Sequence, residues 1–212
     1  MRYLCGMNRL SALGGVPVSA SVVASFYPDI KAANKKVAQL EHEGSLIRLK
    51  RGLYVVSPQI SGCRLSTCLM ANEIYAPSYV SMHSALRHWG LIPEAVVAMQ
   101  SMTTKHSRCF ENPFGRFEYV RVDREVFPIG VTQSVECGVR FFIASAEKAL
   151  CDLVASTAGL SLRYRTDAVR FLEEDLRFDM DYLPKMQRSV LEQYVRVGKK
   201  AESIGAILKL LG

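Results

Sequence analysis

The stretch LIRLKRGLYVV at residues 46–56 combines strand-forming side chains with three cations that crowd around a single glycine. Apolar residues alternate with other residues on both sides of that glycine, which is the pattern of half-buried strands. We expect strands over about residues 46–49 and 53–56 that pair with each other across a tight turn. Gly52 can supply the positive φ that such a turn usually needs. The pattern therefore predicts a hairpin with one face on a hydrophobic core and a cationic tip.

Three amphipathic segments come before this hairpin. Apolar residues recur at helical spacing over residues 4–13, and a short helix can begin after Ser19. In that short helix we expect Val22 and Val23 to face inward. After a turn, a further helical pattern runs over residues 30–40. Two short helices, a tight turn and a third helix are the skeleton of a helix-turn-helix, and the hairpin behind them predicts a winged helix-turn-helix.

The positive charge of the chain is concentrated in this first segment. The formal net charge of the whole chain is +7. Residues 1–60 carry eight Lys and Arg against three Asp and Glu, residues 61–150 carry nine against eight, and residues 151–212 carry ten against nine. A local excess of +5 in the first segment, against +1 in each of the others, indicates a polyanionic partner for that segment.

Two groups of polar side chains in the first segment are candidate contacts to double-stranded DNA. On the third helix they lie opposite Val37 and Leu40, where an asparagine can read a base edge and lysines can neutralise phosphates. At the hairpin tip, long cations can reach the phosphate backbone or the minor groove. Lysines on a helix face are usually an ordinary solvated surface, but the cationic tip and the local charge together favour DNA binding. The candidate residues are Lys31, Asn34, Lys35, Arg48, Lys50 and Arg51.

The remaining chain alternates helical and strand-like patterns. Helical patterns cover residues 65–75 and 79–89, a strong helix begins at Ser145, and the last fifty residues are amphipathic and helical. Strand-like runs lie at residues 96–102, 117–122 and 139–143. The fold class is therefore α+β, with a winged helix-turn-helix DNA-binding domain at residues 1–60. A mixed α/β domain with a helical C-terminal tail follows at residues 61–212.

Candidate catalytic residues are few. Glu147, Lys148 and Asp152 share one helix, but Lys148 and Asp152 are four residues apart and are expected simply to pair. A nuclease strand motif of the Glu-x-Lys type would need a lysine where the candidate strand, with Glu118, has Val120. The six cysteines and four histidines show no metal-ligand spacing. We expect no enzymatic activity, catalytic residue, metal or cofactor.

The sequence contains no signal peptide and no apolar run long enough for a membrane span. Irregularly spaced cysteines without a Cys-x-x-Cys pair are typical of free thiols in a reducing compartment. We therefore expect a cytoplasmic protein that does not contact a membrane.

Three segments carry a resemblance to a known family. LEHEGSLIRLKRGLYVV, APSYVSMHSALRHWGLI and SAEKALCDLV occur in this order along the chain. Together they resemble the AbiEi family, the antitoxin and transcriptional regulator of type IV toxin–antitoxin systems. The resemblance implies a winged helix that binds repeats in its own promoter and represses it. It also implies that the C-terminal domain antagonises a nucleotidyltransferase toxin without stable direct binding. Carried onto this chain, the DNA contacts fall on Lys31, Asn34, Lys35, Arg48, Lys50 and Arg51.

Two alternatives to a repressor and antitoxin stay open. One is a winged-helix module fused to a divergent nuclease or nucleotide-processing domain. The other is a ligand-responsive regulator that has no toxin partner.

Overall fold

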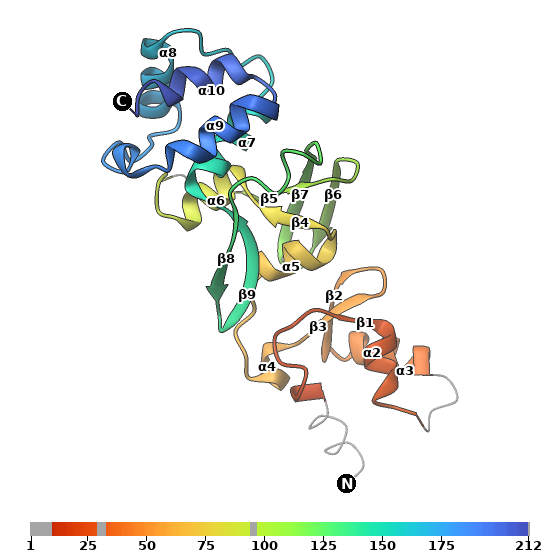
Figure 1. Cartoon of the computed structure of the whole chain (residues 1–212). Helices are drawn as coiled ribbons and strands as arrows, with labels where there is room; N and C mark the ends of the chain where they lie inside the picture. Colours follow the sequence, from red (N-terminus) through yellow and green to blue (C-terminus); the bar gives the residue numbers. More distant parts are fainter. Residues whose placement is uncertain (1–9, 29–32, 94–96, 212) are drawn as a thin grey trace.

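The computed structural model describes residues 10–28, 33–93 and 97–211, and in the helix that begins at Ala33 it describes side chains from Lys35 onward. The N-terminal part, up to residue 61, packs two helices against a three-stranded sheet with the strand order β1-β3-β2 (Figure 1). A short helix then leads into the C-terminal part. The elements are β1 (Val18–Ser19), α2 (Ala20–Ser25), α3 (Ala33–His42), β2 (Leu46–Lys50), β3 (Leu53–Val56) and α4 (Pro58–Ser61).

The predicted hairpin is confirmed. Strands β2 and β3 pair antiparallel, and Gly52 in the turn between them has a φ of +78°. The register shifts between Arg48 and Lys50, so the ladder contains a bulge just before the turn. This bulge changes the direction of the side chains that follow it, which matters for Lys50.

Two of the three helices expected before the hairpin are present, as α2 and α3, whereas most of the first, predicted over residues 4–13, lies outside the described residues. The Oγ atom of Ser19 accepts a hydrogen bond of 3.3 Å from the backbone N–H of Val22 and caps α2. The expectation for this helix is half wrong, because Val23 is fully buried whereas the side chain of Val22 is 41% exposed. A six-residue helix turns only one narrow face to its core, so two consecutive valines cannot both lie on it.

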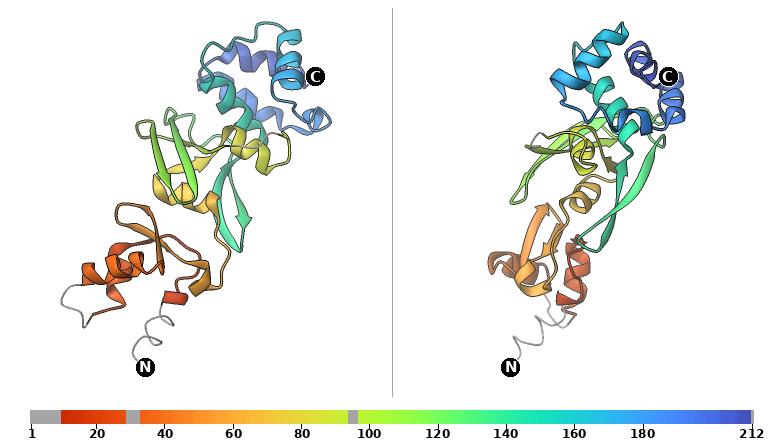
Figure 2. Two further views of the ribbon diagram at one scale, coloured as in Figure 1. Left: turned by 180° about the vertical axis from the view of Figure 1, so that it is seen from behind. Right: turned by 90° about the vertical axis from the view of Figure 1, so that its left-hand side faces the viewer.

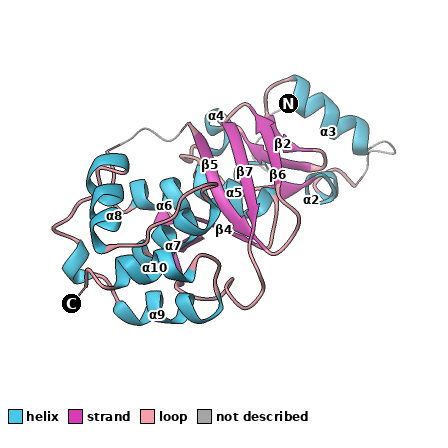
Figure 3. Ribbon diagram, turned by 90° about the horizontal axis from the view of Figure 1, so that it is seen from above, coloured by secondary structure: helices cyan, strands magenta, loops and turns pink. Residues whose placement is uncertain are grey.

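The C-terminal part contains a mixed six-stranded sheet with the strand order β6-β7-β5-β4-β9-β8 (Figure 1). Figure 3 shows β5 and β7 of this sheet side by side, seen from above. Strand β5 runs parallel to β7, β4 runs parallel to β9, and the other neighbours are antiparallel. The strands are β4 (Ser78–Val80), β5 (Ala98–Thr103), β6 (Arg108–Asn112), β7 (Gly115–Arg121), β8 (Val131–Glu136) and β9 (Val139–Ala144).

Helices surround this sheet in two groups. Helix α5 lies between the sheet and the N-terminal part, whereas the helices of the tail gather at the opposite end of the molecule (Figure 2). The predicted helical tail is confirmed, with a π-helical turn at Phe171–Asp175 and a 3-10 turn at Leu183–Lys185. The helices are α5 (Thr67–Ile74), α6 (Met82–His88), α7 (Ala146–Ser156), α8 (Arg165–Arg170), α9 (Arg188–Val197) and α10 (Ala201–Leu208). None of the helices described is both long and apolar enough to cross a membrane.

Two expectations for the C-terminal part are wrong. The helical pattern of residues 79–89 predicts one helix. In the structure its first residues form the central strand β4, and helix α6 begins only at Met82. Tyr79 and Val80 are completely buried, and burial between two neighbouring strands favours the extended conformation of these bulky side chains. The strand-like runs of the sequence predict three strands, whereas the sheet of the C-terminal part contains six. Two of the missed strands, β6 and β8, are the sheet edges and carry polar side chains that weaken the apolar alternation.

The hairpin belongs to both parts of the molecule. Leu49 and Val55 are buried in the large core of the C-terminal part, while Leu46 and Tyr54 are buried in the small core beneath α2 and α3. A hydrogen bond of 3.2 Å from the Asn112 amide to the carbonyl oxygen of Leu49 joins β2 to the β6–β7 turn. The position of the hairpin is thus fixed from two sides.

Candidate nucleic-acid interface

The outward face of α3 is the first candidate surface. Val37 and Leu40 are buried against the sheet, and Lys35 on the other side of the helix is exposed. The neighbouring Lys36 is half-buried, and its ammonium donates to the Oε1 atom of Gln39 at 3.2 Å and lies 5.8 Å from the centre of the Tyr27 ring. The face opposite the core is therefore polar and cationic, as the spacing predicts.

Two of the predicted DNA contacts near this face lie outside what the structure describes. Lys31 falls in the segment 29–32, which is not described. Asn34 is in the first turn of α3, but its side chain is not described. Their predicted roles remain predictions from the sequence.

Arg51 occupies the tip of the hairpin together with Gly52, and both residues are exposed. Within the described part of the chain, the guanidinium group of Arg51 has no hydrogen-bond or ion-pair partner. A long side chain on a two-residue turn can reach outward by several ångströms without disturbing the strands behind it. Arg51 is therefore in a position from which it can contact an external anion.

Arg48 is placed differently, because it connects the hairpin to α3. Its guanidinium group donates to the carboxylate of Glu41 at 2.7 Å and lies 5.9 Å from the centre of the Tyr54 ring. The hydrogen bond and the negative charge of Glu41 raise the pKa of Arg48. The side chain is still about half exposed, at 52%, so one side of the guanidinium group remains open to solvent.

The alternation of residues along the hairpin predicts that Lys50 belongs to its cationic tip, and the structure places the Lys50 side chain differently. Its ammonium turns toward the C-terminal part and donates to the carbonyl oxygen of Ile74 at the end of α5, at 2.5 Å. Burial lowers the pKa of Lys50, and the positive charge of Lys105 lowers it further. The bulge between Arg48 and Lys50 explains the difference, because a strict alternation would place both side chains on the same face.

The space between the hairpin and the β6–β7 turn is an open groove of about 630 Å³. Its lining contains cations from the hairpin and also the carboxylates of Glu41 and Glu111. Charges of both signs do not favour a polyanion inside this groove. The candidate DNA surface is therefore the outward face of α3 together with the exposed hairpin tip, although Arg51 at that tip also lines the groove.

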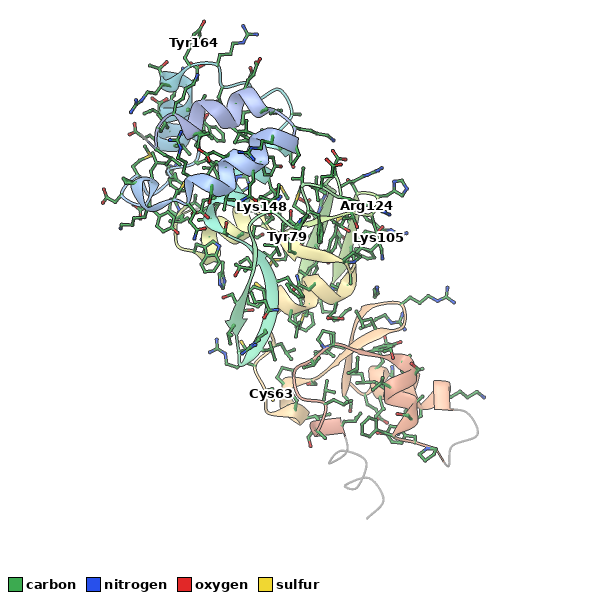
Figure 4. The ribbon with its side chains drawn as sticks, in the orientation of Figure 1. Cys63, Tyr79, Lys105, Arg124, Lys148 and Tyr164 are labelled. Carbon is green, nitrogen blue, oxygen red and sulfur yellow. The ribbon has the colours of Figure 1, made fainter. Side chains whose placement is uncertain are left out.

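The other predicted charge cluster lies deep inside the C-terminal part. The Nζ atom of Lys148 is 3.0 Å from the Oδ1 atom of Asp152, and both side chains are completely buried. The prediction that these two residues pair is confirmed. Figure 4 shows Lys148 beside Tyr79, at the junction between the sheet and the tail helices. The Asp152 carboxylate also accepts hydrogen bonds from Tyr79 (3.0 Å), Ser81 (2.8 Å) and Tyr194 (3.1 Å).

The same cluster also satisfies the Lys148 ammonium. It donates to the carbonyl oxygen of Val126 at 2.9 Å, and it lies 4.6 Å from the centre of the Tyr194 ring. Burial lowers the pKa of Lys148, and burial next to Asp152 raises the pKa of Tyr79 and Tyr194. Each of these polar and charged groups has its hydrogen-bond or ion-pair partner inside the cluster. This is the arrangement of a structural network and not that of a general base.

Sequence spacing identified only two members of this network, since Tyr79, Ser81 and Tyr194 come from distant segments. Glu147, the third residue of the predicted cluster, points elsewhere and accepts a hydrogen bond of 2.8 Å from the backbone N–H of Gln187. Among the described residues, no group of three or more His, Cys, Asp or Glu side chains is placed to hold a metal ion.

Comparison with known proteins adds information on the fold. No protein-family model and no curated protein matches this chain. Among solved structures, it is similar to the crystal structure of the RV2827C protein from Mycobacterium tuberculosis, with a TM-score of 0.60 and 13% sequence identity. The two proteins share a fold. The similarity covers 97% of this chain and 75% of the RV2827C chain, so it extends over both the N-terminal and the C-terminal part.

Proposed function

We propose that this chain is a transcriptional autorepressor that binds double-stranded DNA through a winged helix-turn-helix and acts as the antitoxin of a type IV toxin–antitoxin pair. The observation that carries the DNA-binding half of the proposal is the placement of α3 and the β2–β3 turn on the same side of the N-terminal part (Figures 1 and 2). A helix and a hairpin tip arranged in this way can contact one duplex together.

Within this proposal the contacts have different tasks. Helix α3 enters the major groove, where Asn34 reads a base edge and Lys35 contacts phosphate. Arg51 at the hairpin tip contacts the phosphate backbone or the minor groove. Arg48 holds the hairpin against α3 through Glu41 and offers its open side to a phosphate. Lys50 is left out, because its ammonium is bound to the carbonyl oxygen of Ile74.

The antitoxin half of the proposal rests on the resemblance to the AbiEi family, and one structural observation supports it. The two later segments of that resemblance contribute to a single network, with Tyr79 and Ser81 from one segment and Lys148 and Asp152 from the other. These segments therefore depend on each other in the folded chain. The proposed antagonist is a nucleotidyltransferase toxin, countered without a stable complex between the two proteins.

Fluorescence anisotropy with the DNA upstream of the chain's own reading frame tests the DNA-binding half. We expect tight binding to that duplex and weaker binding to a scrambled one. Arg51→Ala should weaken binding to both duplexes by a similar factor and reduce the slope of log K against log salt by about one. Arg165→Ala removes an equal charge from the exposed start of α8 and is the matched control.

Two outcomes would contradict the proposal. If the promoter duplex bound no better than the scrambled duplex, the chain would not be a specific repressor. If the protein cut plasmid DNA in the presence of a divalent metal, the nuclease alternative would replace it. The antitoxin half is tested separately, by co-expression with a neighbouring nucleotidyltransferase reading frame, where growth should be restored without co-purification of the two proteins.

A further inference from the structure

A cavity of about 490 Å³ opens in the C-terminal part, and none of the proposed DNA contacts lines it. It lies between the end of α5, the start of β4, the β8–β9 strands and the turn around Phe127. Its volume is within the range of pockets that bind small molecules, which is roughly 300–1,000 Å³. Tyr79 is the one residue that this cavity shares with the buried network of Asp152, to which it contributes its hydroxyl group.

Three aromatic rings form the walls of the cavity. They belong to Tyr79, Phe127 and Phe142, and Pro77 and Pro128 add further apolar surface. The rings of Tyr79 and Phe127 meet edge to face, with their centres 5.0 Å apart. Such rings offer their electron-rich faces to a cation or to another aromatic ring.

Phe142 is held in place although it is half exposed. Its side chain is 50% accessible, while its neighbours Phe141 and Ile143 are buried on the other face of the strand. The Asn72 side chain accepts a hydrogen bond of 2.6 Å from the backbone N–H of Phe142 and donates one of 3.2 Å to its carbonyl oxygen. This double hydrogen bond fixes the backbone that carries the ring, so the aromatic wall exists before any ligand arrives.

Glu73 is the one charged residue among those that line the cavity. It is exposed, and within the described residues its carboxylate makes no hydrogen bond and no ion pair. The Lys50 ammonium is the charge that interacts with it at longer range. Among the described residues that line it, the cavity thus combines an apolar aromatic interior with one carboxylate that makes no direct ion pair.

We propose that this cavity binds a small organic cation of the arylalkylamine class, in which an alkyl ammonium group is attached to an aromatic ring. The apolar body of the ligand packs among Tyr79, Phe127 and Phe142, and its ammonium group lies near Glu73 and the face of a ring. A carboxylate and aromatic faces both attract an ammonium group, and both disfavour an anion. The inference concerns a ligand site and does not depend on the proposed DNA binding or on a toxin.

The test uses the full chain and three probes of similar size that differ in charge: 2-phenylethylamine, 2-phenylethanol and phenylacetate. Titrations followed by the backbone amide signals of Glu73 and Phe142 should show saturable binding of the amine, about tenfold tighter than that of phenylacetate, with the alcohol between them. Glu73→Gln should reduce the preference of amine over alcohol, and Phe142→Ala should weaken all three probes.

Matched variants separate the cavity from general effects on the protein. Glu111→Gln removes a carboxylate from the groove beside the hairpin, and Tyr164→Ala removes an exposed ring from the tail; neither should change the affinities. Glu73 and Phe142 are solvent-exposed, so their variants are expected to fold, which a melting curve checks. The proposal is overturned if the amine fails to saturate these signals at millimolar concentration, if phenylacetate binds as well as the amine, or if Phe142→Ala binds like the parent chain.

Discussion

Among the described residues, the buried side chains that cluster beneath α2 and α3 are aliphatic residues and Tyr54, whereas the large core of the C-terminal part encloses an ammonium group and a carboxylate. Lysine and arginine thus have opposite roles in the two parts. In the N-terminal part Lys35 and Arg51 are exposed to water, as the proposed contacts to phosphates require. In the large core, Lys148 has lost its water and must be satisfied by Asp152 and the groups around it. Sequence composition alone does not separate these roles, but burial does.

We expect the largest difference between the two parts in how their stability responds to alkaline pH. In the C-terminal part, burial raises the pKa of Cys68 to about 12, and it also raises the pKa values of Cys151, Tyr79, Tyr119 and Tyr194. The native state therefore keeps protons that the unfolded state releases above the ordinary pKa of 9.0 for the two thiols and of 10.0 for the three tyrosines. Stability is fully present below pH 9 and falls as the pH rises toward 12, by about 1.4 kcal/mol per pH unit for each such group.

The pKa of Lys148 is lowered, so this group makes stability rise with pH. It is a single group against the five whose pKa is raised. Urea unfolding followed by the fluorescence of Trp89, the one tryptophan of the chain, measures the effect in the C-terminal part. Cys68→Ala should make the decrease with pH less steep. A free energy of unfolding that stayed constant between pH 9 and 11 would contradict this view of the core.

Asp152→Ala should produce the largest loss of stability among single substitutions at neutral pH. It leaves the Lys148 ammonium buried without its carboxylate and removes the acceptor of three hydroxyl groups. We expect a loss of about 3–5 kcal/mol in the free energy of unfolding, measured by urea titration. The matched control is Glu174→Ala, which breaks an ion pair of the same i,i+4 spacing with Arg170 on the surface and should cost less than about 1 kcal/mol. Similar losses for both variants would mean that burial does not distinguish the two pairs.

Gly52→Val should affect DNA binding more than stability. The φ of +78° is unfavourable for valine by about 1 kcal/mol or more, although an added side chain at this position meets no other atom within 4 Å. The strain should shift the turn and displace Arg51. Gly159→Val, at a φ of +72° in the tail and equally free of contacts, should cost a similar amount of stability but leave DNA affinity unchanged. If the two variants bound promoter DNA alike, the hairpin tip would not be part of the interface.

Lys50→Ala should have the smallest effect, and it sharpens the distinction between Lys50 and Arg51. It removes the hydrogen bond to Ile74 and should cost about 1 kcal/mol of stability. The salt dependence of DNA binding should stay the same, because the ammonium faces the C-terminal part. A reduction of the salt slope by about one, as expected for Arg51→Ala, would show instead that Lys50 reaches a phosphate.

The elements that were predicted correctly are those in which local pattern and tertiary packing agree. The alternation around Gly52 predicts the hairpin, and Ser145 followed by an apolar stripe predicts α7, whose first turn is capped by the Ser145 hydroxyl. Strand β4 was missed because Tyr79 and Val80 are followed directly by helical residues, and only the burial of β4 between two strands makes it extended. No local signal carries that information.

The same limit applies to the candidate sites. The spacing of Lys148 and Asp152 on one helix is a local property and predicts their ion pair. Tyr194 reaches Asp152 from a helix 42 residues away in sequence, and only the fold brings the two together. The direction of Lys50 depends on a bulge of one residue in a five-residue strand, which alternation by itself cannot reveal. The cavity beside Phe142 is formed by four separate segments and has no sequence signature.

The division of the hairpin between two cores has a consequence for how such a chain can evolve. Leu49 and Val55 complete the large core, and Asn112 holds the carbonyl group of Leu49, while the neighbouring residues Leu46 and Tyr54 complete the small one. Recombination that exchanged residues 1–60 for an unrelated DNA-binding segment would remove side chains that the sheet and α5 need for their own folding. The two parts are therefore not independently exchangeable, and α3 and the hairpin tip can change without damage to either core only by substitutions that leave these four side chains in place.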